Sequence, residues 1–284
     1  MRRVIKSIKF GILLSLPLVF IGCGKSGVLL RCDSALKKGT VVREITEFLI
    51  DGGSVTLDSG GQLISGQMTS LNTTAVETER LATDRVRVLR LVDSGKTTTT
   101  GFGETEDETT TNPLQGIPVL GKLSNGKWVY SLESGTATSK QLKKLKSMSD
   151  EITETLYPSH RVRIGDRWDI DPQAVKVFLG EDVLRFSGTG SMALNSLTQY
   201  AGHECAQLTL ILQATATWLD DENNEVTVDL GVQTEILRAI DTFTDLSQNG
   251  KGYIKMSGDI LSNGSRIKMS LTGPVKISSF TIVK

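Results

Sequence analysis

Few side chains in this sequence are suited to acid–base or nucleophilic chemistry. The chain has 284 residues, of which 2 are His and 3 are Cys. Serine hydrolysis needs a nucleophilic Ser, an imidazole base and an acid that orients the base. The Gly-x-Ser-x-Gly elbow does not occur, and the run Ser187–Ser191 has its glycines in the wrong order. The sequence therefore predicts a protein that is not an enzyme.

Metal and cofactor sites are not expected either. His203 and Cys205 are two residues apart, so on a strand they would share one face, but two ligands do not make a zinc site. Residues 221–225 alternate acidic and amide side chains as in a calcium loop, yet Val226 stands where such a loop needs Gly. We interpret this stretch as a hairpin turn.

The N-terminus has the features of an exported protein. Residues 1–9 contain four basic and no acidic residues, and Phe10–Gly22 is an apolar stretch that is too short to span a membrane. We predict a signal peptide over residues 1–22. The balanced charge of the whole chain, 32 basic and 32 acidic residues, gives no reason to expect a nucleic-acid partner.

The residues Ile21-Gly22-Cys23-Gly24 resemble the lipobox of bacterial lipoproteins. The resemblance implies that Cys23 is acylated and becomes the first mature residue, with residues 23–31 as the lipidated Cys and a short tether. It implies a bacterial cell-envelope protein whose partner is the membrane. Gly24 is not the Asp-type retention signal, which favours the outer membrane facing the periplasm. An ordinary signal peptide with an incidental Cys, or an uncleaved anchor, is the alternative.

Cys32 and Cys205 remain once Cys23 is assigned to lipid. The cell envelope is oxidising, so a disulfide between them is permitted. It would close a long loop and stabilise the fold by about 3–5 kcal/mol. Two separate buried thiols are the alternative.

Alternation with a period of two dominates the second half of the chain and predicts antiparallel strands. From Ala206 to Trp218 the even positions are apolar, and the odd positions are mainly Gln and Thr. Gly273-Pro274 is expected to end one strand before the last strand begins. Further strands are expected near residues 226–232, 253–260, 266–271 and 275–283, and, less regularly, at 41–50, 85–92, 117–123 and 127–132.

One amphipathic helix is predicted over Ser139–Leu156, because apolar side chains recur there at helical spacing. Thr138 and Gln141 have the spacing of a capping box, and Pro158 stops the helix. Four lysines lie in its first half, for which a solvated face and a basic end resting on anionic head groups both remain open. The fold class is α+β and mostly β: a curved antiparallel sheet with one main helix, in a single domain over 32–284.

The stretch 94–112 is interpreted as a disordered Thr-rich loop. It holds eight Thr, several Gly and four acidic residues, with almost no apolar residue except Phe102. Such a composition cannot bury enough surface to order itself.

Two further segments resemble uncharacterised bacterial lipoprotein families. Tyr157–Trp168 contains a Pro, a basic–apolar run and Gly-Asp-x-Trp, and Gly202–Ala206 fits Gly-x-x-Cys-Ala. More loosely, a sheet with one helix is similar to periplasmic lipid-binding lipoproteins, whose half-open barrels hold acyl chains between sheet and helix. That resemblance implies a lipid or another hydrophobic ligand and assigns no catalytic residue.

The resulting hypothesis is a membrane-anchored envelope lipoprotein that binds a hydrophobic ligand without catalysis. It predicts a cavity between helix and sheet, lined by Leu142, Leu145, Leu210 and Trp218. The alternative is a protein-interaction or structural module of an envelope assembly. That alternative predicts an exposed apolar patch or strand edge in place of a cavity.

Overall fold

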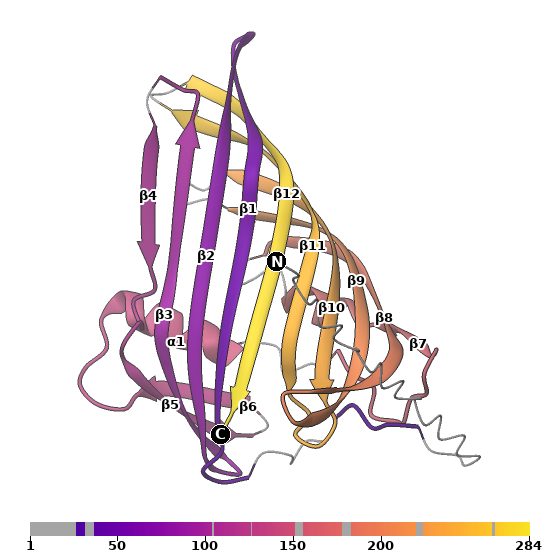
Figure 1. Cartoon of the computed structure of the whole chain (residues 1–284). Helices are drawn as coiled ribbons and strands as arrows, with labels where there is room; N and C mark the ends of the chain where they lie inside the picture. The colour runs from indigo at the N-terminus through magenta and orange to yellow at the C-terminus, as the bar shows by residue number, and fades with distance from the viewer. Residues whose placement is uncertain are drawn as a thin grey trace, which may run out of the picture.

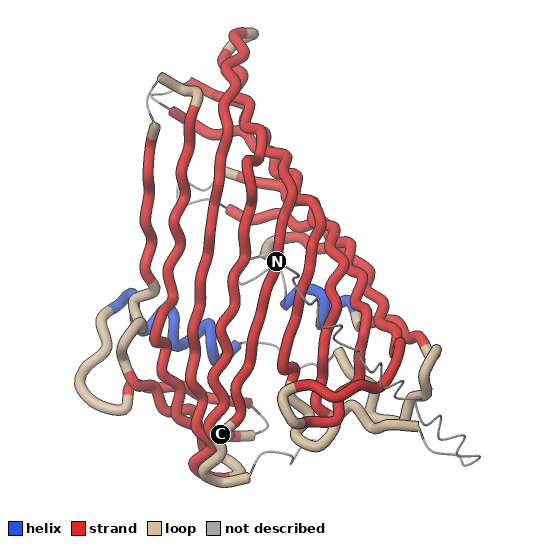
Figure 2. Tube along the Cα trace, viewed as in Figure 1, coloured by secondary structure: helices blue, strands red, loops and turns tan. Residues whose placement is uncertain are grey.

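Nearly all of the described chain belongs to one antiparallel sheet (Figures 1 and 2). The computed structural model describes residues 27–31, 37–103, 105–125, 127–150, 156–177, 183–219, 224–262 and 265–284. The strand order is β6-β5-β3-β2-β1-β12-β11-β10-β9-β8-β7, and β4 pairs with β3 on the side that also carries β5. The predicted class, a mostly β fold built on a curved antiparallel sheet, is confirmed.

Most strands are long, and the helices are short. Apart from Ile117, which lies just before β5, the predicted strands fall within strands of the structure, whereas β2 and β4 were not expected from the sequence pattern. The elements are β1 (Val41–Ser59), β2 (Gln62–Ala82), β3 (Arg85–Thr100), β4 (Glu106–Thr111), β5 (Pro118–Ser124), β6 (Lys127–Leu132), α1 (Ser139–Asp150), β7 (Arg167–Ile170), α2 (Pro172–Val177), β8 (Arg185–Tyr200), β9 (His203–Leu219), β10 (Glu225–Ala239), β11 (Asp245–Ser262) and β12 (Ser265–Val283).

Both helices lie on the same face of the sheet, behind it in the view of Figure 1, and we call this the inner face. Glycines on it allow close approach between strands. A Cβ atom on Gly252 would lie 1.9 Å from the carbonyl oxygen of Gly231, and one on Gly273 would lie 2.7 Å from the Cα of Gly53. Larger residues would push these strands apart, so the bend of the sheet requires glycine at both positions.

The core is divided into separate clusters along the sheet. The larger one joins inner-face residues of β8–β12 and β1 to α2, to residues 156–170 and to Leu30 of the N-terminal segment. A second, smaller one joins Leu145 and Met148 of α1 to Val119 of β5 and to residues of β3. Each helix therefore covers its own part of the inner face, near opposite edges of the sheet.

Helix α1 begins as the sequence predicts. The backbone N–H of Thr138 donates to Oε1 of Gln141 (2.8 Å), and the N–H of Gln141 donates to Oγ1 of Thr138 (3.3 Å). This reciprocal capping box satisfies two N–H groups that the first turn leaves free. The helix is described to Asp150, and Leu156, its predicted last residue, lies in a bend.

The interpretation of residues 94–112 as a disordered loop was wrong. Residues 94–100 form the end of β3 and 106–111 form β4, and the two strands pair from Ser94↔Thr111 to Thr99↔Glu106. The Thr-rich composition carries little apolar surface, but β-branched Thr favours extended backbone, and the ladder supplies its hydrogen bonds. Phe102, at the turn between these strands, packs against the larger core cluster.

The expected chain break at Gly273-Pro274 was also wrong, because β12 runs through both residues. Pro274 lies opposite a bulge in β1, where the pairing shifts between Ile50↔Val275 and Ser54↔Thr272. The bulge interrupts the ladder at the point where Pro274 has no N–H to donate. A central strand can therefore contain this proline.

Candidate functional site

Two neighbouring rows of apolar residues cross the inner face, toward the end of the sheet that carries the β1–β2 hairpin. Alternation sends every second residue of a strand to this face, and the antiparallel registers place those residues side by side. We call the two rows together the apolar wall. The first row is Trp218, Val226, Gly258, Met269, Leu57 and Ile64, and the second is Phe186, Ala216, Val228, Met256, Leu271, Val55 and Gly66.

The apolar wall is incompletely covered. Ile64 keeps 41% of its surface exposed, and Leu57, Trp218 and Met256 are only partly buried. Elsewhere on the same face Leu208 is fully buried, because α2 and its flanking residues pack over that part of the sheet. Apolar surface that stays partly open to water favours contact with another apolar molecule.

Aromatic rings border the apolar wall at both sides. At the β2 side, a Cβ on Gly66 would lie 2.5 Å from the ring of Phe102, so the ring rests directly on the backbone. At the β8 side, a Cβ on Gly188 would lie 2.8 Å from the ring of Phe186. Glycine next to each ring leaves the space that the aromatic side chain occupies.

The inner face becomes polar away from the apolar wall, on β12, β1, β2 and β3. The hydroxyl of Thr46 donates to Oγ of Ser279 (3.1 Å), and the hydroxyl of Ser279 donates to the carboxylate of Glu44 (3.1 Å). The hydroxyls of Ser70 and Thr97 lie 3.0 Å apart across β2 and β3. The same face therefore offers an apolar region and a polar region that follow one another along the strands.

The structure does not bring the four predicted cavity residues together. Leu142 is 57% exposed on α1, and Leu145 is buried against β3 and β5 in the smaller cluster. Leu210 is buried in the larger cluster, and Trp218 is partly exposed in the apolar wall. Helix α1 packs near β6, while Leu210 and Trp218 lie on β9, at the far side of the strand order. Only Trp218 belongs to the candidate site.

The other members of the apolar wall were missed in the sequence. The residues Asp58-Ser59-Gly60-Gly61-Gln62 lie between Leu57 and Ile64 and have the composition of a tight hairpin turn. A turn at that position pairs Leu57 with Ile64, as the structure does. This local signal was sufficient to find β2 and one side of the wall.

The cysteines are only partly described. Cys23, the predicted lipidation site, and Cys32 lie outside the described residues. The thiol of Cys205 is buried and forms no disulfide with a described residue, and its pKa is raised mainly by burial and further by the charge of Asp241. A raised pKa keeps the thiol protonated and unreactive at neutral pH. The disulfide between Cys32 and Cys205 stays a prediction.

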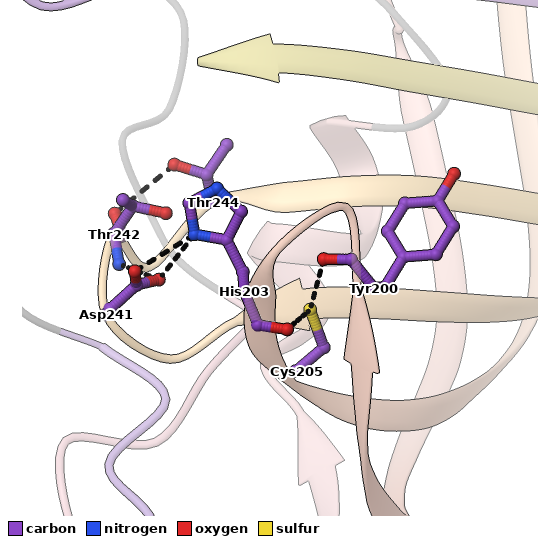
Figure 3. A network of polar contacts seen from close by, with 6 residues as sticks. All are labelled: Tyr200, His203, Cys205, Asp241, Thr242 and Thr244. Atoms are coloured by element: carbon purple, nitrogen blue, oxygen red, sulfur yellow. Dashed lines mark hydrogen bonds and ion pairs between the residues drawn. The ribbon is translucent and has the colours of Figure 1, made fainter. Parts of the chain in front are cut away.

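His203 hydrogen-bonds Asp241 beside this thiol, in the network that Figure 3 shows. Its Nδ1 lies 2.9 Å from the carboxylate of Asp241, which also accepts the backbone N–H of Thr242 (2.8 Å). Burial alone would raise the pKa of Asp241, but the hydrogen bond and charge of His203 lower it overall. The contact between His203 and Asp241 fastens the hairpin between β10 and β11 to the start of β9. Among the described residues no serine hydroxyl hydrogen-bonds His203.

Metal-ligating clusters and membrane-spanning helices are both absent from the described part of the chain. No group of three or more His, Cys, Asp or Glu side chains there is placed to hold a metal ion. No helix in that part is both long enough and apolar enough to cross a membrane.

Comparison with known proteins gives only distant likenesses. No protein-family model matches the sequence, and no curated protein matches it. A structure described as "lipid-protein interactions in lipovitellin" is 8% identical with a TM-score of 0.43, and the match covers 87% of this chain but 26% of that one. The chain thus spans about a quarter of the lipovitellin chain.

Two bacterial structures are less similar. The COG4313 outer membrane channel from Pseudomonas putida F1 is 10% identical with a TM-score of 0.22, over 88% of this chain and 97% of that one. A DUF1329 family protein from Desulfovibrio piger is 8% identical with a TM-score of 0.15, over 84% and 83%. Similarities this low indicate no function for this chain.

Proposed function

We propose that this chain is a lipid-anchored protein of the bacterial cell envelope that binds a hydrophobic ligand without catalysis. The observation that carries the proposal is the apolar wall: two adjacent cross-strand rows of apolar residues, incompletely covered, on the inner face of a curved sheet. A ligand lying along the wall would bury the exposed parts of Ile64, Leu57 and Trp218.

The ligand class that fits best is an amphiphile with an acyl chain. The chain would lie along the apolar wall, and its polar group would meet the hydroxyls of Thr46, Ser70 and Ser279 on the neighbouring part of the same face. Each buried methylene contributes about 0.8 kcal/mol, so ten of them contribute about 8 kcal/mol before the cost of ordering the ligand. That balance favours reversible binding.

The anchor part of the proposal rests on the lipobox-like residues around Cys23. The described chain begins at Gly27. The carbonyl of Gly27 accepts a hydrogen bond from Nη1 of Arg161 (2.6 Å). At about 3.5 Å per extended residue, the link from Cys23 to Gly27 reaches about 14 Å. Acylation of Cys23 would therefore hold the folded body close to the membrane surface.

The test compares two adjacent residues of β2 on opposite faces. Ile64 belongs to the apolar wall, and Leu63, which is 69% exposed, points to the outer face. We expect the protein purified from envelopes to carry a lipid that native mass spectrometry detects, and Ile64→Asp to lose it while Leu63→Asp keeps it. Ligand binding at the wall would be contradicted if the unmodified chain carried no lipid beyond its covalent anchor. Equal loss of the bound lipid in both variants would contradict it as well.

A specific observation supports the alternative of a protein-interaction module. On the outer face, Ile45 and Phe280 are cross-strand neighbours, and both are exposed. Exposed Leu71 of β2 lies opposite Leu49, which follows Ile45 a short way along β1. If this patch binds another envelope protein, Phe280→Asp should abolish crosslinking to that protein and leave lipid occupancy unchanged. Crosslinks that survive Phe280→Asp would exclude this patch as the interface.

A further inference from the structure

The N-terminal segment Gly27–Arg31 is fastened to the folded body at several points. The backbone N–H of Val28 donates to the carbonyl of Val162 (2.8 Å), and the N–H of Val162 donates back to Val28 (2.9 Å). The carbonyl of Leu30 accepts Nε of Arg238 (2.7 Å). Gly27 and Val28, at the start of the described chain, are therefore held in a fixed position beside Val162.

Directly after Val162 the chain makes a tight turn over Arg163–Asp166. The N–H of Arg163 donates to Oδ2 of Asp166 (2.8 Å), and the N–H of Asp166 donates to the carbonyl of Arg163 (3.0 Å). Gly165 has φ +94°, a left-handed conformation that favours glycine. Two more backbone bonds, between this turn and Leu194, hold it against β8.

The tip of this rigid turn is apolar and arginines flank it, while exposed Asp169 and Asp171 follow a few residues further along the chain. Ile164 is 60% exposed, although the hydrogen bonds on both sides hold it in a fixed place. Arg161, Arg163 and Arg167 are all exposed, and within the described residues no ion pair engages Arg163 or Arg167. Asp166 is the acidic group within the turn, and it is engaged by the N–H of Arg163.

We propose that this turn is a membrane-contact surface for a bilayer that contains anionic lipid. Ile164 enters the interfacial region, and Arg163 and Arg167 meet anionic head groups. The inference rests on the proposed anchoring at Cys23, because the acylated residue would lie four positions before Gly27, whose carbonyl is bound by Arg161. An apolar tip flanked by arginines matches the chemistry of the interface, in which cations near the surface are attracted to anionic lipid.

This orientation decides where the apolar wall faces. The N-terminal segment contacts the end of the sheet that carries the β10–β11 hairpin, through Arg238, whereas the wall lies toward the end with the β1–β2 hairpin. Figure 1 shows these two ends at opposite extremes of the long strands. A body resting on the turn would thus present the wall away from the membrane that holds its anchor.

The test uses the full acylated chain on vesicles with and without phosphatidylglycerol. An environment-sensitive fluorophore is attached to Ile164→Cys, with Leu63→Cys as the matched exposed position at the other end of the sheet and the unmodified chain as the labelling background. We expect a blue shift at position 164 that is larger on anionic vesicles, and none at position 63. Adding Arg163→Ser and Arg167→Ser should lower the affinity of the turn for anionic vesicles by roughly fivefold for each arginine removed.

Two adverse outcomes have different meanings. If the labelled chain floats with vesicles but position 164 shows no shift, or the same shift as position 63, the membrane-contact turn is excluded and the anchor stands. If the chain does not float with vesicles at all, the anchor is excluded, and the proposed contact is excluded with it. Ligand binding at the apolar wall is measured separately by lipid occupancy.

Discussion

The guanidinium of Arg238 lies over the ring of Tyr157, with its central carbon 3.7 Å from the ring centroid. Both side chains also bind the same carboxylate: Nη1 of Arg238 lies 2.6 Å from Oδ1 of Asp245, and the hydroxyl of Tyr157 donates to Oδ2 (2.7 Å). Arg238 reaches the carbonyl of Leu30 as well. One buried arginine thus connects the N-terminal segment, the segment after α1 and two strands.

This network predicts a large effect on stability when Arg238 is removed. Arg238→Ala leaves the carboxylate of Asp245 and the carbonyl of Leu30 without their buried partner, which should cost about 3 kcal/mol or more. Arg185→Ala is the matched control, because Arg185 pairs with Glu225 at the solvent-exposed surface and should cost less than about 1 kcal/mol. Urea unfolding of both variants measures the difference, and equal midpoints would exclude the role of Arg238.

Tyr157 predicts a loss of stability in alkaline solution. Burial, followed by the charge of Asp245, raises the pKa of Tyr157 well above its ordinary value of 10.0. The folded chain therefore holds the phenolic proton more tightly than the unfolded chain. Its contribution to stability is complete below pH 10 and is lost as the pH rises from there toward the pKa of the folded state.

Tyr157→Phe tests this relation, because phenylalanine has no proton to lose. The variant should be less stable than the unmodified chain at pH 8 by about 1–2 kcal/mol, owing to the lost hydrogen bond to Asp245. Above pH 10 the difference should shrink. Denaturant midpoints of both chains across this range give the result, and parallel curves would show that Tyr157 does not titrate with unfolding.

Helix α1 predicts two different outcomes for leucines that are three residues apart. Leu145→Ala removes a buried side chain from the cluster with Val119 and should cost about 2–4 kcal/mol. Leu142→Ala changes an exposed side chain and should stay within about 0.5 kcal/mol of the unmodified chain. Thermal unfolding compares them. A comparable loss in both would mean that α1 packs through a different face.

How far the sequence predicted the fold depends on the kind of pattern. Alternation over Ala206–Trp218 was enough to find β9, because one side of that strand is buried along most of its length. β3 and β4 were missed over 94–111, because both carry Thr in place of apolar residues there, and an edge pair needs little burial to stay paired. The predicted strand end at Pro274 was wrong, because the bulge in β1 that accommodates this proline involves residues more than two hundred positions earlier.

The candidate site was less accessible to sequence reasoning than the strands. The prediction joined Leu142 and Leu145 to Leu210, on the assumption that one helix covers the middle of the sheet. The position of a helix on a wide sheet is set by long-range packing, and α1 packs near an edge. The rows of the apolar wall depend on the pairing registers of β2, β1 and β12. Only the register between β1 and β2 could be inferred from neighbouring residues, because their turn has a recognisable composition.

The central claim is that an acyl chain lies along the apolar wall. The most direct measurement is quenching of Trp218 fluorescence by a lipid with a brominated acyl chain, in a protein carrying Trp128→Phe and Trp168→Phe. Trp218 is partly exposed in the first row of the wall, three strands from Met269, so a chain bound along the wall passes within quenching range. We predict saturable quenching that Ile64→Asp abolishes and Leu63→Asp preserves. The claim would be contradicted if Trp218 stayed unquenched at high lipid concentration. It would also be contradicted if Ile64→Asp left the quenching unchanged.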